Sequence, residues 1–125
     1  GMSMGWNIDG ERPVWIQLKE HLAKQIVSGQ YQCGERMPSV RDLASEAGVN
    51  PNTMQRALAA LDQEGLTATS RTSGRKVTEN AEKIETCRSE FAHRIMERYL
   101  KEMAELGYTK SQAAGLIEKG DRTDG

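Results

Sequence analysis

The side chains best suited to recognising a ligand in this sequence are polar residues at helical spacing between positions 52 and 63. They are Asn52, Gln55, Arg56 and Gln63, and the small apolar Ala59 lies on the same face. A side-chain amide can form two hydrogen bonds to one adenine, and an arginine can bind guanine or phosphate. A small alanine lets a helix lie close in the major groove. The pattern is therefore typical of a DNA-reading helix. On an arbitrary amphipathic helix, however, such a face is usually only solvated.

The opposite face of the same segment predicts a helix with a defined start and end. Asn50 is a suitable N-cap, Pro51 suits the first helical position, and Gly65 is suited to end the helix. The apolar residues expected to be buried are Met54, Ala57, Leu58 and Leu61. Their spacing of i, i+3, i+4 and i+7 defines one apolar stripe.

A shorter helix is predicted immediately before it. Ser39 is its N-cap, Asp42 lies three residues later, and Gly48 ends it. Its apolar stripe is Val40, Leu43, Ala44 and Ala47. Two amphipathic helices joined by a turn of about four residues are the pattern of a helix-turn-helix.

A third helix is needed to cover the two short ones, because they bury too little surface alone. The sequence predicts it from Pro13 to Ser28, ended by Gly29. Its expected buried residues are Trp15, Leu18, Leu22 and Ile26. His21 lies beside this stripe and is expected at the surface or at the core boundary.

A basic hairpin is predicted directly after the helix-turn-helix. Residues 66–69 and 76–78 can pair as strands, and residues 72–74 form a turn signal. Arg71 and Arg75 are expected at its tip. A basic loop is often only solvated, but in this position it predicts a winged helix.

Residues 13–78 resemble the DNA-binding domain of the GntR family of bacterial transcription regulators. The matching stretches are PVWIQLKEHLAKQIVSGQYQCGERMPSVRDLA, AGVNPNTMQRALAALDQEGL and the wing rich in glycine and basic residues. The resemblance implies three helices and a two-stranded wing, with the recognition helix in the major groove and the wing at the minor groove or backbone. The DNA-binding residues it implies, together with the expected tip residue Arg71, are Arg41, Asn50, Asn52, Thr53, Gln55, Arg56, Ser73, Gly74 and Arg75.

Two departures from the family pattern affect these expectations. Many members have arginine where this chain has Pro51, so Asn52, Gln55 and Arg56 would read more of the site. The wing usually ends in Gly-x-Gly-aromatic-Val, whereas here it reads GRKV over residues 74–77. The added charge suggests phosphate contacts.

The C-terminal part predicts a dimerisation segment over residues 79–119. A long helix over 79–106 has too wide an apolar face for one small domain to cover, and Thr109 begins a second helix with Ala113, Leu116 and Ile117 facing inward. The expected dimer contacts are Ile84, Phe91, Ile95, Tyr99 and Met103. The alternative is that the helix folds back onto its own domain. So short a tail resembles the YtrA-like subfamily, whose members often control transporter operons.

The distribution of charge divides the chain into a mildly basic N-terminal part and an acidic C-terminal part. Residues 10–78 carry nine basic and seven acidic side chains, whereas residues 79–125 carry eight and ten. Residues 1–12 are expected to be a flexible lead-in that includes Gly1 as a tag scar and is pinned locally by Trp6 or Ile8. Residues 120–125 are expected to be a disordered tail. Cys33 and Cys87 are expected to be reduced thiols.

The sequence carries no pattern for other classes of function. It has no run of 18 apolar residues, no secretory signal, no metal-ligand spacing and no nucleophile paired with a base. We therefore expect no cofactor, no metal, no membrane contact and no enzymatic activity. The expected protein is a cytoplasmic homodimeric repressor that binds an inverted-repeat operator in double-stranded DNA. The alternative is a winged-helix module that binds another protein, and the sequence names no small-molecule effector.

Overall fold

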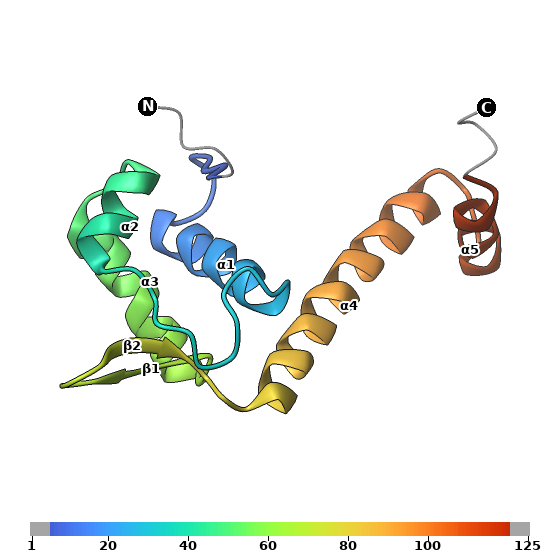
Figure 1. Ribbon diagram of the computed structural model, residues 1–125. Coiled ribbons are helices and arrows are strands. Elements are labelled where there is room, and N and C mark those ends of the chain that lie inside the picture. Colours follow the sequence, from blue (N-terminus) through green and yellow to red (C-terminus); the bar gives the residue numbers. More distant parts are fainter. Residues whose placement is uncertain (1–5, 121–125) are drawn as a thin grey trace. The chain divides into compact units, whose positions relative to one another are not determined.

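Five helices and one hairpin make up the structure, a computed structural model that describes residues 6–120 (Figure 1). In order they are α1 (Val14–Val27), α2 (Val40–Ala47), α3 (Pro51–Glu64), β1 (Thr67–Ser70), β2 (Gly74–Val77), α4 (Ala81–Glu105) and α5 (Lys110–Lys119). The architecture confirms the predicted mostly helical winged helix-turn-helix followed by two C-terminal helices. Gly1 and the tail beyond Gly120 lie outside the described residues. The chain divides into two compact units, residues 1–88 and 89–125.

The core of the first unit lies where α3 packs against α1 and α2, as Figure 1 shows. The largest fully buried side chains are Leu18, Leu22, Ile26, Leu43, Met54, Leu58, Leu61 and Val77. The predicted stripe of α3 is buried throughout, and in α2 only Val40 stays partly exposed. Helix α2 ends at Gly48 and α3 at Gly65, and both glycines are left-handed, with φ of 72° and 84°. The predicted helix ends are therefore confirmed.

Helix α1 differs from its prediction in its bounds and in the residues that it buries. It begins at Val14 with Pro13 as the N-cap, it ends at Val27, and Trp15 is only half-buried. Gln17 is buried instead, because its side-chain amide forms hydrogen bonds with the backbone of the lead-in. Its Nε2 donates to the carbonyls of Asp9 (2.9 Å) and Arg12 (2.8 Å). The Asp9 amide donates to Gln17 Oε1 in return, at 2.9 Å. A buried amide that satisfies three backbone groups escapes the usual cost of polar burial.

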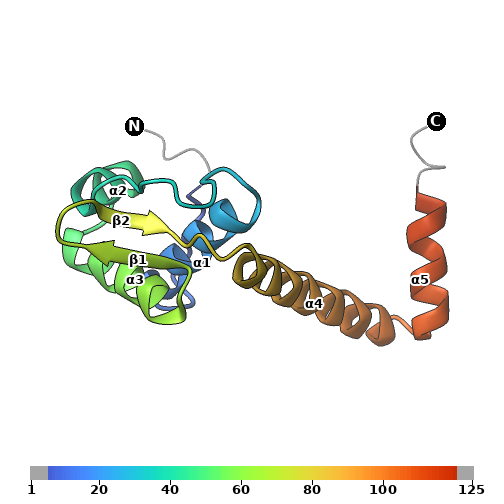
Figure 2. The same ribbon diagram turned by 60° about the horizontal axis from the view of Figure 1, so that its bottom comes forward.

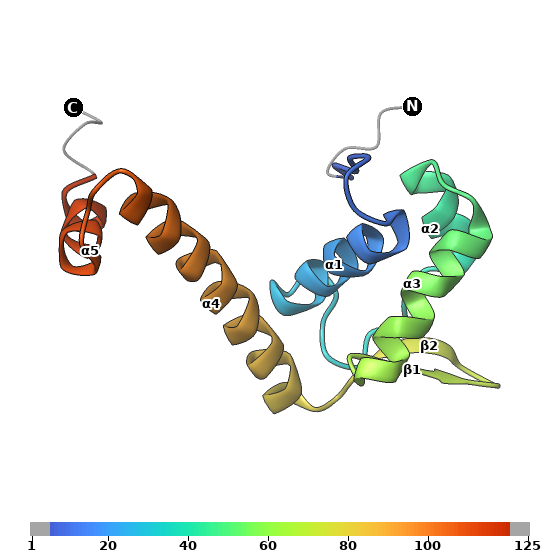
Figure 3. The same cartoon turned by 180° about the vertical axis from the view of Figure 1, so that it is seen from behind.

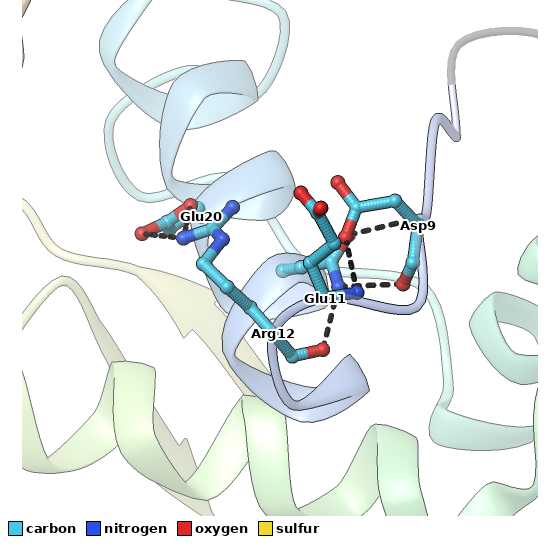
Figure 4. A network of polar contacts seen from close by, with 5 residues as sticks. Asp9, Glu11, Arg12 and Glu20 are labelled. Atoms are coloured by element: carbon cyan, nitrogen blue, oxygen red, sulfur yellow. Dashed lines mark hydrogen bonds and ion pairs between the residues drawn. The ribbon is translucent and has the colours of Figure 1, made fainter.

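The lead-in is held against the first unit at several points. Figure 4 shows the Arg12 guanidinium reaching Glu20 on α1, at 3.0 Å, and the Asp9 carboxylate accepting the Glu11 amide. Trp6 is buried, and its ring stacks on His21 with 4.0 Å between centroids. Residues 6–12 therefore take a defined path across α1, where the sequence pattern predicts flexibility with local pinning by Trp6 or Ile8.

The wing is an antiparallel pair whose register differs slightly from the prediction (Figure 2). Thr67 pairs with Val77 and Ser70 with Gly74, so Gly74 begins a strand and the turn occupies residues 71–73. Arg36 forms an additional antiparallel bridge with Lys76. The loop before α2 therefore extends the edge of the wing, which anchors the wing close to the helix-turn-helix.

The second unit contains the later turns of α4 and all of α5 (Figure 3). Helix α5 begins with Thr109 as its N-cap, as predicted, with a capping box in which Thr109 and Gln112 bond reciprocally at 3.1 and 2.9 Å. The Tyr99 hydroxyl donates to the carbonyl of Ala113 at 2.7 Å, and Ala113 is buried. The sequence pattern also predicts inward positions for Leu116 and Ile117. In the single chain both are exposed, which corrects that expectation: α5 contributes one buried residue, Ala113.

Candidate nucleic-acid interface

The predicted DNA-reading face of α3 is open to solvent. Its exposed residues are Asn52, Gln55, Arg56, Ala59 and Gln63. This exposure follows from the packing, because the apolar stripe turns the other side of the helix toward α1 and α2. Amide and guanidinium groups on such a face are free to meet base edges in a major groove.

Asn50 and Thr53 stand differently from the rest of the predicted set. Asn50 Oδ1 accepts the amide of Asn52 at 2.7 Å, which caps α3. One of its hydrogen-bonding groups is therefore engaged in shaping the helix. Thr53 is half-buried, so less of its side chain is accessible.

Arg56 lies at the margin of this face, toward α1. Its guanidinium carbon lies 4.4 Å from the centroid of the Trp15 ring, a cation–π arrangement. The sequence pattern predicts Trp15 in the core, but the ring forms a platform at the surface. Arg56 is thus directed along the edge of the recognition helix.

Arg41 is exposed in the first turn of α2. The helix start beside it is ordered by the Ser39 hydroxyl, which accepts the Asp42 amide at 3.1 Å. The predicted N-cap is therefore confirmed. Free backbone amides and an arginine at one helix start form a surface that suits phosphate.

The structure places Arg75 differently from the prediction. It lies in β2 and its side chain faces Asp62 at the end of α3, with Nε to Oδ1 and Nη2 to Oδ2 both at 3.1 Å. The hydroxyls of Thr67 and Thr69 donate to the same carboxylate at 2.5 and 2.7 Å. Arg75 is therefore not at the tip; it fixes the wing to α3, because β2 starts at Gly74 and alternation turns residue 75 inward.

The charge of Asp62 is stabilised by this arrangement. Partial burial alone would raise the pKa of its carboxyl, but hydrogen bonds from Arg75, Thr67 and Thr69 and the attraction of Arg75 outweigh burial and lower the pKa. Asp62 is therefore ionised at neutral pH. The ion pair between Arg75 and Asp62 therefore holds the inner face of the wing against α3.

Basic side chains remain on the outer face and at the tip of the wing. Lys76 and Arg36 are bridge partners and both exposed, and Arg71 is exposed in the turn. A Cβ atom at Gly74, where φ is +72°, would meet Arg36 Nε at 3.4 Å. Glycine thus lets the guanidinium lie against the strand.

Arg36 is not among the residues that the sequence pattern predicts to bind DNA. The signal was available, since an arginine directly before the Met37-Pro38 step in an extended segment can reach a neighbouring strand. Among the predicted tip residues, Ser73 is half-buried and its amide donates to the Ser70 hydroxyl at 3.4 Å. The turn is therefore shaped by hydroxyl groups.

Other kinds of site find no support over residues 6–120. This range holds no cluster of three side chains able to bind a metal ion. Nor does any helix within it have the length and apolar character needed to cross a membrane.

The comparisons identify related proteins over both units. The family of bacterial regulatory proteins, gntR family, matches residues 16–77. The HTH-type transcriptional regulator YhcF of Bacillus subtilis is 31% identical over 101 residues, which cover 81% of this chain and 84% of YhcF. The HTH-type transcriptional repressor YtrA of Bacillus subtilis is 35% identical over 69 residues, which cover 55% of this chain and 53% of YtrA.

A solved structure extends the likeness to the fold. The GntR family transcriptional regulator from Listeria monocytogenes superposes with a TM-score of 0.83 at 33% identity. The match covers 90% of this chain and 98% of the Listeria chain. A family of transcription regulators also agrees with the expectation that the protein is not an enzyme. This chain belongs to the GntR family of DNA-binding helix-turn-helix transcriptional regulators and is similar to its short members YhcF and YtrA.

Proposed function

We propose that this protein is a cytoplasmic homodimeric repressor that binds an inverted-repeat operator by placing α3 in the major groove. The observation that carries the proposal is the exposed polar face of α3, flanked by exposed arginines on α2 and the wing. The similar protein YtrA is named a transcriptional repressor, which supports the sign of regulation. A transporter operon is the target we infer from the likeness to YtrA-like regulators.

The structure suggests a division of labour among the contacts. Asn52 and Gln55 present amides on the exposed face of α3 and are proposed to read bases. Three exposed arginines are proposed to bind phosphates: Arg41 in α2, Arg71 in the turn of the wing, and Arg36 beside β2. Arg75 is assigned to the wing anchor instead, because both Nε and Nη2 of its guanidinium donate to the Asp62 carboxylate.

Selection of random duplexes on the purified protein tests the proposal directly. We expect a two-fold symmetric site, because each protomer presents one recognition helix. The spacing of its half-sites would report the dimer geometry. A protein-interaction module would instead select no sequence. A salt titration with random duplex would then detect no salt-dependent binding.

Two variants test the division of labour on the selected operator. Gln55→Ala should weaken operator binding by about 1–3 kcal/mol per half-site while leaving random duplex unaffected. Arg41→Ala should weaken both and reduce the salt slope by about one per half-site. Equal effects of the two variants on operator and random DNA would refute the assignment.

The dimer is proposed to form through the apolar face of α4 and α5. In the single chain the exposed fractions are 53% for Ile95 in α4, 73% for Leu106 directly after α4, and 64% for Ile117 in α5. None of the 25 residues of α4 is buried. A large apolar surface of this kind is unfavourable in water and is covered when a second copy packs against it.

A charge placed on this face tests the dimer. Ile95→Lys should shift the protein toward monomers in analytical ultracentrifugation and weaken operator binding by at least tenfold, because an unpaired charge in an apolar interface is costly. Thr86→Lys is the matched control, since Thr86 is exposed on the same helix outside the apolar rows. A dimer of unchanged strength in Ile95→Lys would exclude this face as the interface.

A further inference from the structure

Trp15 occupies an unusual place for a tryptophan in a small helical domain. The other predicted apolar positions of α1, such as Leu18 and Leu22, are fully buried, whereas Trp15 keeps part of its ring at the surface. A ring that remains partly hydrated contributes less to the core than a buried one. The partly exposed ring in the first turn of α1 is instead available for contacts at the surface.

The ring contacts the cation of the recognition helix. Arg56 is the single basic residue between residues 51 and 64, and its guanidinium lies over the Trp15 ring at 4.4 Å. Within residues 6–120 the structure gives Arg56 no carboxylate partner. The contrast with Arg75 is clear, because Asp62 neutralises that side chain.

Stacking leaves the hydrogen-bonding capacity of a guanidinium intact. A cation–π contact uses the face of the planar group, while its five N–H donors point outward in the plane. The platform therefore restricts the rotamers of a long side chain without occupying its donors. A side chain ordered in advance loses less entropy when it binds.

We propose that Trp15 is a positioning residue that holds Arg56 ready for a phosphate oxygen at the margin of the major groove. The inference rests on the proposed DNA-binding mode of α3. A phosphate is favoured over a base edge because the stack draws Arg56 toward α1, at the flank of the exposed face formed with Gln55. The fork geometry of arginine suits paired bonds to a phosphate.

A double-mutant cycle on the full-length protein tests the proposal. Trp15→Met removes the ring and keeps much of the apolar bulk, Trp15→Phe keeps a ring face, and Arg56→Met removes the cation. Dissociation constants and salt slopes are measured on the selected operator and on random duplex, and each variant is melted to check its fold.

The expected results follow from the stack. Trp15→Met should weaken binding about two- to fivefold per half-site, whereas Trp15→Phe retains most of the affinity. In the Arg56→Met background, Trp15→Met should have no further effect. Arg56→Met should lower the salt slope by about one per half-site on both DNAs.

Three results would overturn the proposal. An equal effect of Trp15→Met with and without Arg56 would make Trp15 merely structural. An unchanged salt slope in Arg56→Met would exclude the phosphate contact. If Trp15→Met does not fold, Arg56→Lys decides, because it keeps the charge and loses the planar stack: wild-type affinity in that variant refutes the proposal. Loss of sequence selection by the wild type would instead refute the proposed function itself.

Discussion

Replacing Asp62 by asparagine is the most informative test of how the wing is held. The carboxylate accepts two bonds from Arg75 and one each from Thr67 and Thr69. Asparagine has nearly the same shape but no charge, and its NH₂ group can accept nothing. At least one hydrogen bond to the guanidinium is therefore lost. The remaining hydrogen bonds are accepted by a neutral amide oxygen in place of a charged carboxylate oxygen.

The size of the effect follows from the burial of the pair. The side chain of Arg75 is 11% exposed and that of Asp62 is 27% exposed, so water replaces the lost bonds poorly. Hydrogen bonds to charged groups contribute about 1.5–3 kcal/mol, and removing one partner of a buried pair costs more than removing an exposed one. We expect Asp62→Asn to lower the free energy of unfolding by about 2–3 kcal/mol.

The pH dependence gives the prediction a second signature. The pKa of Asp62 is lowered from its ordinary value of 3.8 in the folded state. The bond network therefore contributes its full stability above pH 3.8, and the contribution is lost as pH falls below 3.8 through the lower folded pKa. The stability gap between wild type and Asp62→Asn should shrink over that interval.

Urea denaturation of both proteins measures the gap, and hydrogen exchange of the Val77 amide, which donates to Glu35, localises it to the wing. Glu64→Gln is the matched control, because the Lys19–Glu64 pair also joins α3 to another element but is more exposed, at 24% and 47%. It should cost less than about 1 kcal/mol. Equal costs for the two variants would refute the argument from burial.

Three further predictions concern stability. Gly65→Ala should lower the unfolding free energy by about 1 kcal/mol or more because φ is +84°, whereas Gly115→Ala in α5, with open space around it, should raise it by about 0.5–1 kcal/mol; urea titrations compare the two signs. Trp6→Phe removes the bond from Nε1 to Glu46 (2.9 Å) and should cost about 1 kcal/mol in the same assay, and no loss would count against that bond. The pKa of His21 is lowered from 6.5, chiefly by burial, so stability should fall with pH below 6.5, and His21→Phe should remove that dependence in melts across this range.

The helix-turn-helix is predictable from sequence because its signals are local. Caps at Ser39 and Asn50, glycines after each helix and apolar stripes at helical period all act within a few residues of one another. Each therefore appears in the structure close to its expected position. The exposed face of α3 is therefore predictable as well, since it is the side of the helix opposite the buried apolar stripe.

The errors occur where long-range partners decide. Trp15 fits the apolar period of α1, but its ring is only half-buried and contacts a cation 41 positions later in the chain. Gln17 is polar and looks exposed, yet the lead-in supplies partners for its amide. Arg75 looks like a tip residue until the strand register turns it toward Asp62. Periodicity within one element contains no information about such partners.

The placement of Trp6 and Trp15 has a practical consequence for optical work on this protein. They are the two tryptophans of the chain, and both belong to the first unit, whereas the aromatic side chains in the described part of the second unit are tyrosines and a phenylalanine. Excitation at the red edge of the absorption band therefore reports on the DNA-binding unit alone. The indole of Trp6 stacks on a histidine and that of Trp15 on a guanidinium. Acidification and operator titration should thus quench two different fluorophores, which Trp6→Phe and Trp15→Phe would separate.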